Sequence, residues 1–103
     1  MSARLFAPRA RRELRAASVW IARDNPAAAH ALIDEAVRSA NRLADHPLLG
    51  RRRPELLPEP YRFWSLRGFP YLLVYNATAT PPRILRVLHM ARDLPAALAE
   101  FDR

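Results

Sequence analysis

Residues 69–76 constrain the fold most, because they form a strand-like run that is apolar on both faces. Phe69, Tyr71 and Leu73 alternate with Leu72 and Val74 along this run. A strand that is apolar on both sides usually lies in the centre of a sheet. Similar runs at 61–67 and 83–90 flank it, with turns indicated at 68 and 78–82. The sequence therefore predicts a small, largely antiparallel sheet with 69–76 inside it.

Two helices are predicted ahead of these strands. The first runs from Pro8 to about Arg23, with alanine and leucine at helical spacing. Asn25 is a suitable N-cap and Pro26 a suitable first residue for the second helix, which extends to about residue 45 and has the strongest periodicity in the chain. Pro47 ends it, since proline disfavours helical geometry in the residue before it. The short break favours an antiparallel helical hairpin.

The remaining segments complete the order β-α-α-β-β-β-α. Residues 3–7 are predicted to form a short first strand, 46–60 an ordered proline-containing loop, and 93–101 a short final helix capped by Asp93. The whole chain, 1–103, is the length of one domain. We expect an α+β fold in which the helical hairpin packs on one face of the sheet.

Charge and composition narrow the class of protein. The formal net charge is +7, and all seventeen basic residues are arginine, which indicates an acidic partner. On the first helix, four arginines (Arg9, Arg11, Arg12 and Arg15) are predicted to face outward. The chain contains no cysteine, no signal-like leader and no apolar run long enough to span a membrane, so we expect a cytoplasmic protein without disulfides.

Four local patterns occur in order along the chain. They are Asp-Asn-Pro-Ala-Ala-Ala at 24–29, Pro-x-x-Gly-Arg at 47–51, an Arg-containing strand followed by an aliphatic strand ending in Tyr75, and an aliphatic strand followed by His89 and Arg92-Asp93. Together with the element order, these patterns resemble the RelE/ParE superfamily of bacterial toxins, and its ParE branch in particular. The resemblance covers nearly the whole chain.

This resemblance implies a toxin of a type II toxin–antitoxin system. Such toxins form hetero-oligomers with a ParD-like antitoxin whose acidic, flexible C-terminal segment folds onto them. ParE-branch toxins bind DNA gyrase and stall it on cut DNA, whereas RelE-branch toxins are ribosome-dependent mRNA endoribonucleases. The resemblance therefore favours an inhibitory binding toxin that is not an enzyme and needs no cofactor, and it implies no sequence-specific nucleic-acid binding.

The ribonuclease alternative requires residues that can cleave RNA. RNA cleavage needs a base, an acid and cations around one phosphate. The RelE pattern includes lysines and a tyrosine near the C-terminus, and this chain has no lysine and no tyrosine after Tyr75. A YoeB-like set is conceivable from His89 with Arg62 and Arg67, together with Glu55 or Glu59. We favour a structural or solvent-facing role for His89.

Candidate binding residues follow from the resemblance, which implies that the sheet receives the antitoxin segment. For the antitoxin we expect a set of strand arginines and aromatics: Arg62, Arg67, Arg86, Arg92, Trp64 and Tyr71. Intramolecular pairing of Arg86 or Arg92 with Asp93 is the competing interpretation. For the target we expect the C-terminal strand and tail, with Arg83, His89, Arg92 and Phe101.

Other residues have less specific interpretations. His30 and His46 lack companions at metal-ligand spacing, so no metal site is predicted. The aromatics Trp20, Phe63, Trp64, Phe69 and Tyr71 are assigned mainly to the core or to the antitoxin groove, because a domain of this size needs its large side chains for packing.

Overall fold

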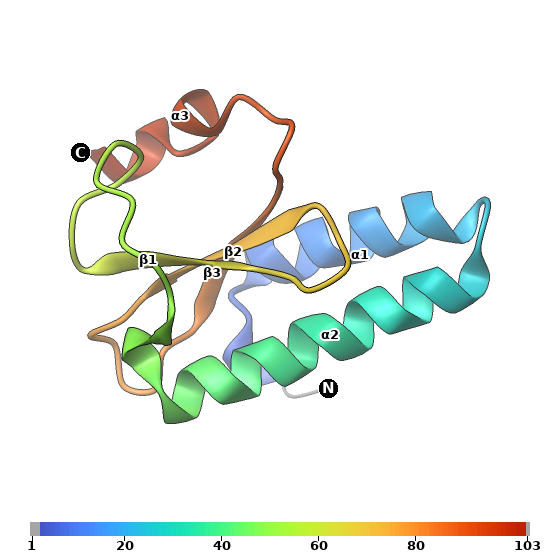
Figure 1. Ribbon diagram of the computed structural model, residues 1–103, viewed down its shortest axis with the longest axis horizontal. Helices are drawn as coiled ribbons and strands as arrows, with labels where there is room; N and C mark the ends of the chain where they lie inside the picture. The colour runs from blue at the N-terminus through green and yellow to red at the C-terminus, as the bar shows by residue number, and fades with distance from the viewer. Residues whose placement is uncertain (1–2, 103) are drawn as a thin grey trace.

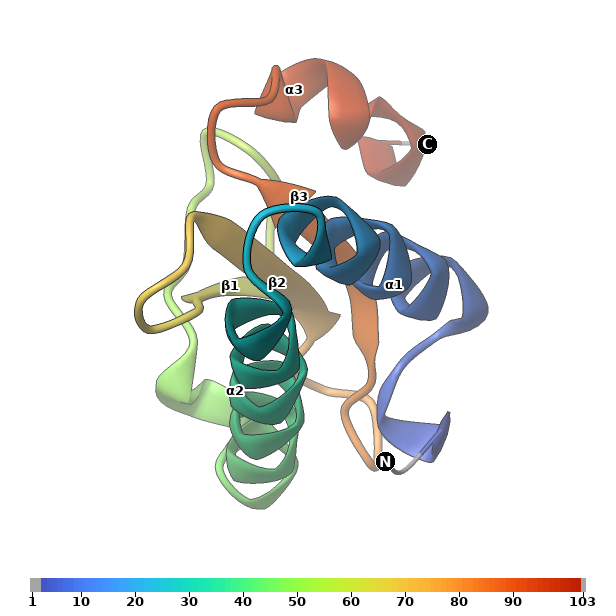
Figure 2. The same ribbon diagram turned by 90° about the vertical axis from the view of Figure 1, so that its right-hand side faces the viewer.

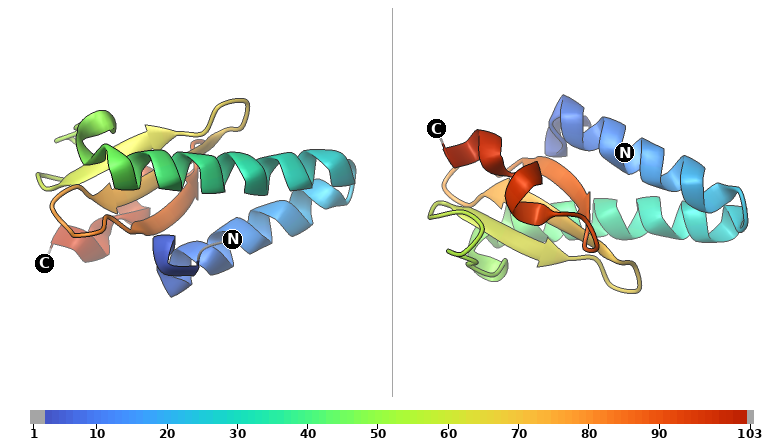
Figure 3. Two further views of the ribbon diagram at one scale, coloured as in Figure 1. Left: turned by 90° about the horizontal axis from the view of Figure 1, so that it is seen from below. Right: turned by 90° about the horizontal axis from the view of Figure 1, so that it is seen from above.

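The helical hairpin forms one layer of the molecule. In the computed structural model, which describes residues 3–102, α1 spans Pro8–Ala22 and α2 spans Pro26–Asp45. The predicted cap is present, because the Asn25 side chain accepts a hydrogen bond from Ala28 N at 3.0 Å and Pro26 opens the helix. The helices meet at the 23–25 turn and separate towards their other ends (Figure 3, left).

The sheet forms the second layer and has the predicted order. Its three antiparallel strands are β1 (Tyr61–Ser65), β2 (Tyr71–Asn76) and β3 (Ile84–His89), with β2 in the centre. Residues 72–75 of β2 are all buried, as expected for a strand covered on both sides. The fold is the expected α+β arrangement, with the hairpin on one face of the sheet (Figures 1 and 2).

The predicted first strand at residues 3–7 is wrong. Residues Ala3–Leu5 form one 3₁₀ turn, and only Phe6 pairs with the sheet, through a parallel bridge to Ile84. Ala7 N donates to Ile84 O at 2.8 Å, and Pro8 then starts α1, so the pairing cannot continue. This segment contributes the buried side chains of Leu5 and Phe6 to the core in place of a strand.

Two apolar clusters lie on opposite faces of the sheet. The first joins both helices to the helix-facing side, with Leu14, Leu32, Leu73 and Tyr75 among its members. The second lies on the other side and includes Phe63, Val74, Leu88 and Leu98. A short C-terminal segment covers this second face (Figure 3, right). It consists of α3 (Leu94–Ala97), whose Asp93 cap accepts from Ala96 N at 3.2 Å, and a 3₁₀ turn at Ala99–Asp102.

Of the five aromatic residues assigned mainly to the core, four pack there and one does not. Phe63, Trp64, Phe69 and Tyr71 pack in or against the two clusters, as expected. Trp20 is 64 % exposed, and the Arg23 guanidinium lies 4.8 Å from its ring centroid. The core assignment of Trp20 is therefore wrong, because its position on α1 faces away from the sheet.

Candidate functional site

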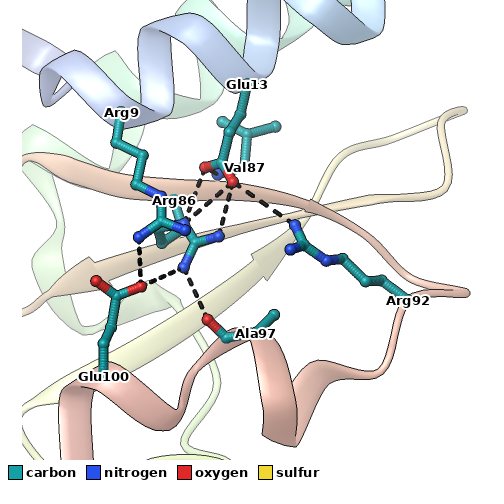
Figure 4. Close-up of polar contacts among 7 residues, drawn as sticks. All are labelled: Arg9, Glu13, Arg86, Val87, Arg92, Ala97 and Glu100. Carbon is teal, nitrogen blue, oxygen red and sulfur yellow. Dashed lines mark hydrogen bonds and ion pairs between the residues drawn. The ribbon is translucent and has the colours of Figure 1, made fainter.

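Arg86 is the centre of the most connected polar cluster among the described residues. It lies on β3 with 1 % of its surface exposed. Its Nε donates to both carboxylate oxygens of Glu13 at 3.1 Å, and Nη2 donates to Glu13 Oε2 at 2.8 Å. Nη1 donates to Glu100 Oε1 at 2.7 Å and to Ala97 O at 2.8 Å (Figure 4). This single guanidinium therefore links α1, β3 and the C-terminal segment.

Glu13 has a second function at the edge of the sheet. Its Oε1 accepts a hydrogen bond from Val87 N at 2.9 Å, so the carboxylate satisfies a backbone donor on the outer side of β3 (Figure 4). Glu13 is placed by α1, which packs along this edge. Edge strands with unpaired N–H groups are potential pairing sites. The carboxylate closes that site at Val87 and neutralises the buried guanidinium at the same time.

Two further arginines surround this cluster at the surface. Arg9 Nη1 lies 2.6 Å from Glu100 Oε1, and Arg92 Nη1 lies 3.9 Å from Glu13 Oε2. Both side chains are about half exposed, at 47 % and 51 %. Three cations therefore share two carboxylates, which leaves a local positive excess where the C-terminal segment meets α1.

Arg86 and Arg92 thus form intramolecular ion pairs, but with carboxylates other than the one considered from sequence. The partners are Glu13 and Glu100, whereas the Asp93 side chain caps α3. Glu13 and Arg86 are 73 positions apart, so neither periodicity nor local spacing could have indicated the pair.

Arg62 belongs to a separate structural unit. Its Nη1 donates to Gly50 O at 3.0 Å and Leu48 O at 3.2 Å, and its Nη2 lies 3.4 Å from Glu59. Beside it, the Tyr75 hydroxyl accepts from Gly50 N at 2.8 Å and donates to Pro47 O. Burial raises the pKa of Tyr75 above its ordinary value of 10.0, while the Gly50 hydrogen bond lowers it. The Pro-x-x-Gly-Arg pattern therefore encodes a turn fixed to the sheet.

Gly50 is required in this turn for steric reasons. A Cβ at this position would lie 2.3 Å from the Tyr75 hydroxyl oxygen and 2.6 Å from a ring carbon. Both contacts are shorter than real Cβ atoms adopt, and the Tyr75 ring is fully buried and cannot move aside.

The six residues expected to bind antitoxin do not form one exposed surface. Trp64 and Tyr71 pack on the helix-facing side, where Trp64 Nε1 donates to Ser39 Oγ at 3.2 Å. Arg86 is buried in the cluster described above. Arg67, in the exposed β1–β2 turn, and Arg92 have accessible side chains. That this set binds the antitoxin stays a prediction, and Arg67 and Arg92 are its members with accessible side chains.

The four residues expected to bind the target lie in three places. Arg83 Nη2 donates to Phe6 O and its Nε to Arg4 O, both at 3.2 Å, which ties the start of β3 to the N-terminal segment. Phe101 packs edge-on against Tyr61 at 5.3 Å between ring centroids. Only His89 and Arg92 come together, in the turn where Arg92 N donates to His89 O. Arg103, the end of the expected tail, lies outside the described residues.

The conceivable catalytic residues are not assembled around one point. His89 pairs with Tyr71 at one end of β2, and Arg62 pairs with Tyr75 at the other. Four residues along a strand correspond to about 13 Å. His89 Nδ1 also accepts from Ala91 N at 3.0 Å. Arg67 is at the His89 end, whereas Arg62 is engaged by turn carbonyls at the opposite end.

Within residues 3–102, no group of three or more His, Asp or Glu side chains is placed to hold a metal ion. Over the same range, no helix combines the length and hydropathy required to cross a bilayer.

Comparison with known proteins identifies the class. Residues 5–94 match the family described as the ParE toxin of the type II toxin–antitoxin system parDE. The chain therefore belongs to the ParE toxin family, in agreement with its hairpin-on-sheet fold. Among individual proteins, it is similar to Toxin RelE3 of Caulobacter vibrioides, with 35 % identity over 82 residues. These residues cover 80 % of this chain and 87 % of that protein.

Proposed function

We propose that this ParE-family toxin acts in the cytoplasm by binding DNA gyrase and stalling it on cut DNA, and that a ParD-like antitoxin neutralises it. The observation that carries the proposal is the dispersal of the conceivable catalytic residues: Arg62 lies about 13 Å along the sheet from His89 and is bonded to turn carbonyls. A toxin that binds its target needs a surface and no assembled acid–base pair.

The family assignment supports the antitoxin part of the proposal. A toxin of a toxin–antitoxin system has an antitoxin partner, and the net charge of +7 favours an acidic one. An acidic flexible segment that folds on a basic protein is captured rapidly, because long-range attraction raises the association rate.

For the target surface we propose the turn that contains His89 and Arg92. Both side chains are exposed, and His89 packs edge-on against Tyr71 at 5.0 Å between ring centroids. The adjacent Met90 is 41 % exposed and adds apolar area beside the cation. Exposed apolar area next to arginine is typical of protein-binding surfaces.

The second candidate function is ribosome-dependent mRNA cleavage, which the name of the similar protein, Toxin RelE3, keeps open. On this alternative, exposed His89 is the acid–base residue, with Arg67 near the same end of the sheet as the cation. The ribosome would have to supply the groups that this chain does not bring together.

The test combines purified toxin with gyrase, ATP and supercoiled plasmid, with and without antitoxin. We expect linear plasmid covalently linked to gyrase, and its loss when antitoxin is added. The His89→Ala variant should weaken gyrase poisoning by no more than a few-fold, because fewer than about 30 % of interface residues cost more than about 1 kcal/mol when truncated. Unaffected gyrase, together with mRNA cleavage that requires His89, would support the second candidate.

A further inference from the structure

The solvent side of α1 carries a row of arginines that lack carboxylate partners. Arg12, Arg15 and Arg23 are exposed, and within residues 3–102 none of them forms an ion pair. They are separated by three and then eight positions, so they project from the same side of the helix. Arg23 follows the last residue of α1 and still has helical backbone angles. We call these three residues the outer row.

No acidic residue of α1 balances the charge of the outer row. The one acidic residue of the helix, Glu13, is turned to the sheet, where it binds Arg86 and Val87 N. The sequence between Leu14 and Arg23 contains no Asp or Glu. The outer row therefore presents its full charge to solvent, on a chain whose formal net charge is +7. An extended line of unpaired cations favours a polyanion as its partner.

The length of the outer row suits a linear polyanion. From Arg12 to Arg23, eleven helical residues rise by about 16 Å. Over the same length, duplex DNA carries about ten phosphates. The last turns of α1 extend beyond the sheet at the closed end of the hairpin (Figure 1), which keeps the sheet away from a partner that lies along the row.

We propose that the outer row binds the phosphate backbone of duplex DNA, so that the toxin contacts the DNA held by gyrase as well as gyrase itself. This inference rests on the proposed function, which places the toxin beside cut DNA. Guanidinium groups donate to phosphate oxygens in bidentate fashion. Because contacts to phosphates carry no sequence information, they position a protein on DNA of any sequence.

The outer row adjoins the surface proposed for the target. In the turn that contains His89 and Arg92, Arg92 Nη1 lies 3.9 Å from Glu13 Oε2, so this turn reaches the flank of α1. A toxin that binds gyrase through the turn therefore holds α1 next to it. Gyrase and its DNA can then be contacted by neighbouring surfaces of one small domain.

The residues of this surface favour DNA over a second protein contact. Charged residues are depleted from the cores of protein–protein interfaces, whereas protein–DNA interfaces are much more positively charged. The large apolar side chains exposed on this part of α1 are Val19 and Trp20, at 57 % and 64 %. The Arg23 guanidinium lies 4.8 Å from the centroid of the Trp20 ring, so the ring supports this cation at the surface.

The first experiment measures binding of full-length toxin to a short fluorescein-labelled DNA duplex by anisotropy, between about 50 and 200 mM salt. The row variant is Arg12→Gln with Arg15→Gln. The matched control is Arg42→Gln with Arg51→Gln, which removes the same charge from exposed positions that form no ion pair within the described chain. Equal circular dichroism melting curves would show that both variants are folded.

The salt dependence gives a quantitative expectation. Each phosphate contact contributes about 0.9 to the slope of log K against log salt, so the row variant should lose about 1.8 of the wild-type slope. At about 50 mM salt it should bind at least about tenfold more weakly. The control should keep the wild-type slope, because it changes only the long-range attraction.

The second experiment repeats the gyrase poisoning assay with the same variants. The toxin concentration for half-maximal cleavage should rise at least about fivefold for the row variant and less than about twofold for the control, because lost phosphate contacts weaken binding to any DNA sequence. Both variants should still bind gyrase in a pull-down without DNA.

The outcomes separate this inference from the proposed function. Equal slopes for the row variant and the control, or equal poisoning by both, would overturn the inference while gyrase poisoning by wild-type toxin stands. Loss of gyrase from the row variant in the pull-down without DNA would make the row a protein contact and overturn it. Tighter wild-type binding to a single-stranded RNA with as many phosphates would overturn it as well. Wild-type toxin that binds the duplex through the row but does not poison gyrase would refute the proposed function alone.

Discussion

The buried ion pair between Glu13 and Arg86 leads to a specific stability prediction. Glu13→Gln keeps the side-chain volume but removes the negative charge that faces a guanidinium with 1 % exposure. Three Arg86–Glu13 hydrogen bonds of 2.8–3.1 Å lose their ionic character, and only Glu100, itself 45 % exposed, remains as a counter-ion. Removing one partner of a buried pair typically costs about 3–5 kcal/mol. Since the amide oxygen can still accept one hydrogen bond, we expect a loss of about 3 kcal/mol.

The assay is urea unfolding of the purified toxin, followed by circular dichroism. With a slope of about 2 kcal/mol per molar urea, the expected loss lowers the midpoint by about 1.5 M. Arg9→Ala is the matched control, because it removes an exposed ion pair to Glu100, and such pairs contribute about 0–1 kcal/mol. The double variant Glu13→Leu with Arg86→Met should recover only part of the loss, because apolar replacements of a buried pair are often neutral but Val87 N and Ala97 O would lose their partners. A Glu13→Gln midpoint equal to that of Arg9→Ala would refute the reasoning.

Three other predictions concern the turn and the end of β3. Gly50→Ala should lower the free energy of unfolding by about 1–3 kcal/mol in urea titrations, because its Cβ would overlap the Tyr75 hydroxyl. Gly68→Asn is the control and should change that free energy by less than about 1 kcal/mol, because the position is open and Asn tolerates its φ of +83°. Burial raises the pKa of Tyr75 in the folded state, so the contribution of Tyr75 to the free energy of unfolding should be complete below pH 10 and decline as the pH rises above that value. Tyr75→Phe should flatten this decline in unfolding midpoints measured from about pH 8 to 11. His89→Ala should arrest growth nearly as well as wild type when expressed without antitoxin, and a complete loss of toxicity would point to catalysis.

The fold was predictable where local patterns determine it. Asn25 and Pro26 define the start of α2, and the two-sided apolar character of residues 71–75 places β2 in the centre of the sheet. The short N-terminal run could not be assigned in the same way, because Phe6 and Ile84 pair only through tertiary contact and Pro8 ends the pairing. Propensity alone does not distinguish a buried 3₁₀ turn from a strand of five residues.

The candidate site was less predictable, because its contacts join distant parts of the chain. Arg67 and Arg92 were expected from the sequence as binding residues, and both are exposed. The burial of Arg86 could not be predicted in this way, because it depends on ion pairs with Glu13 and Glu100. The four arginines on α1 were expected to face outward; Arg9, Arg12 and Arg15 are exposed, and Arg11 is partly buried. Their position beside Ile33 became apparent only from the way the two helices pack.

The most direct test of the account is to locate the cellular damage during toxin expression without antitoxin. Total DNA and mRNA from the same culture would be analysed for gyrase-linked double-strand ends and for new mRNA 5′ ends. We expect gyrase-linked ends to accumulate while mRNA remains intact, and coexpressed antitoxin to prevent both the ends and the growth arrest. Cleavage of ribosome-bound mRNA with no gyrase-linked DNA would contradict it.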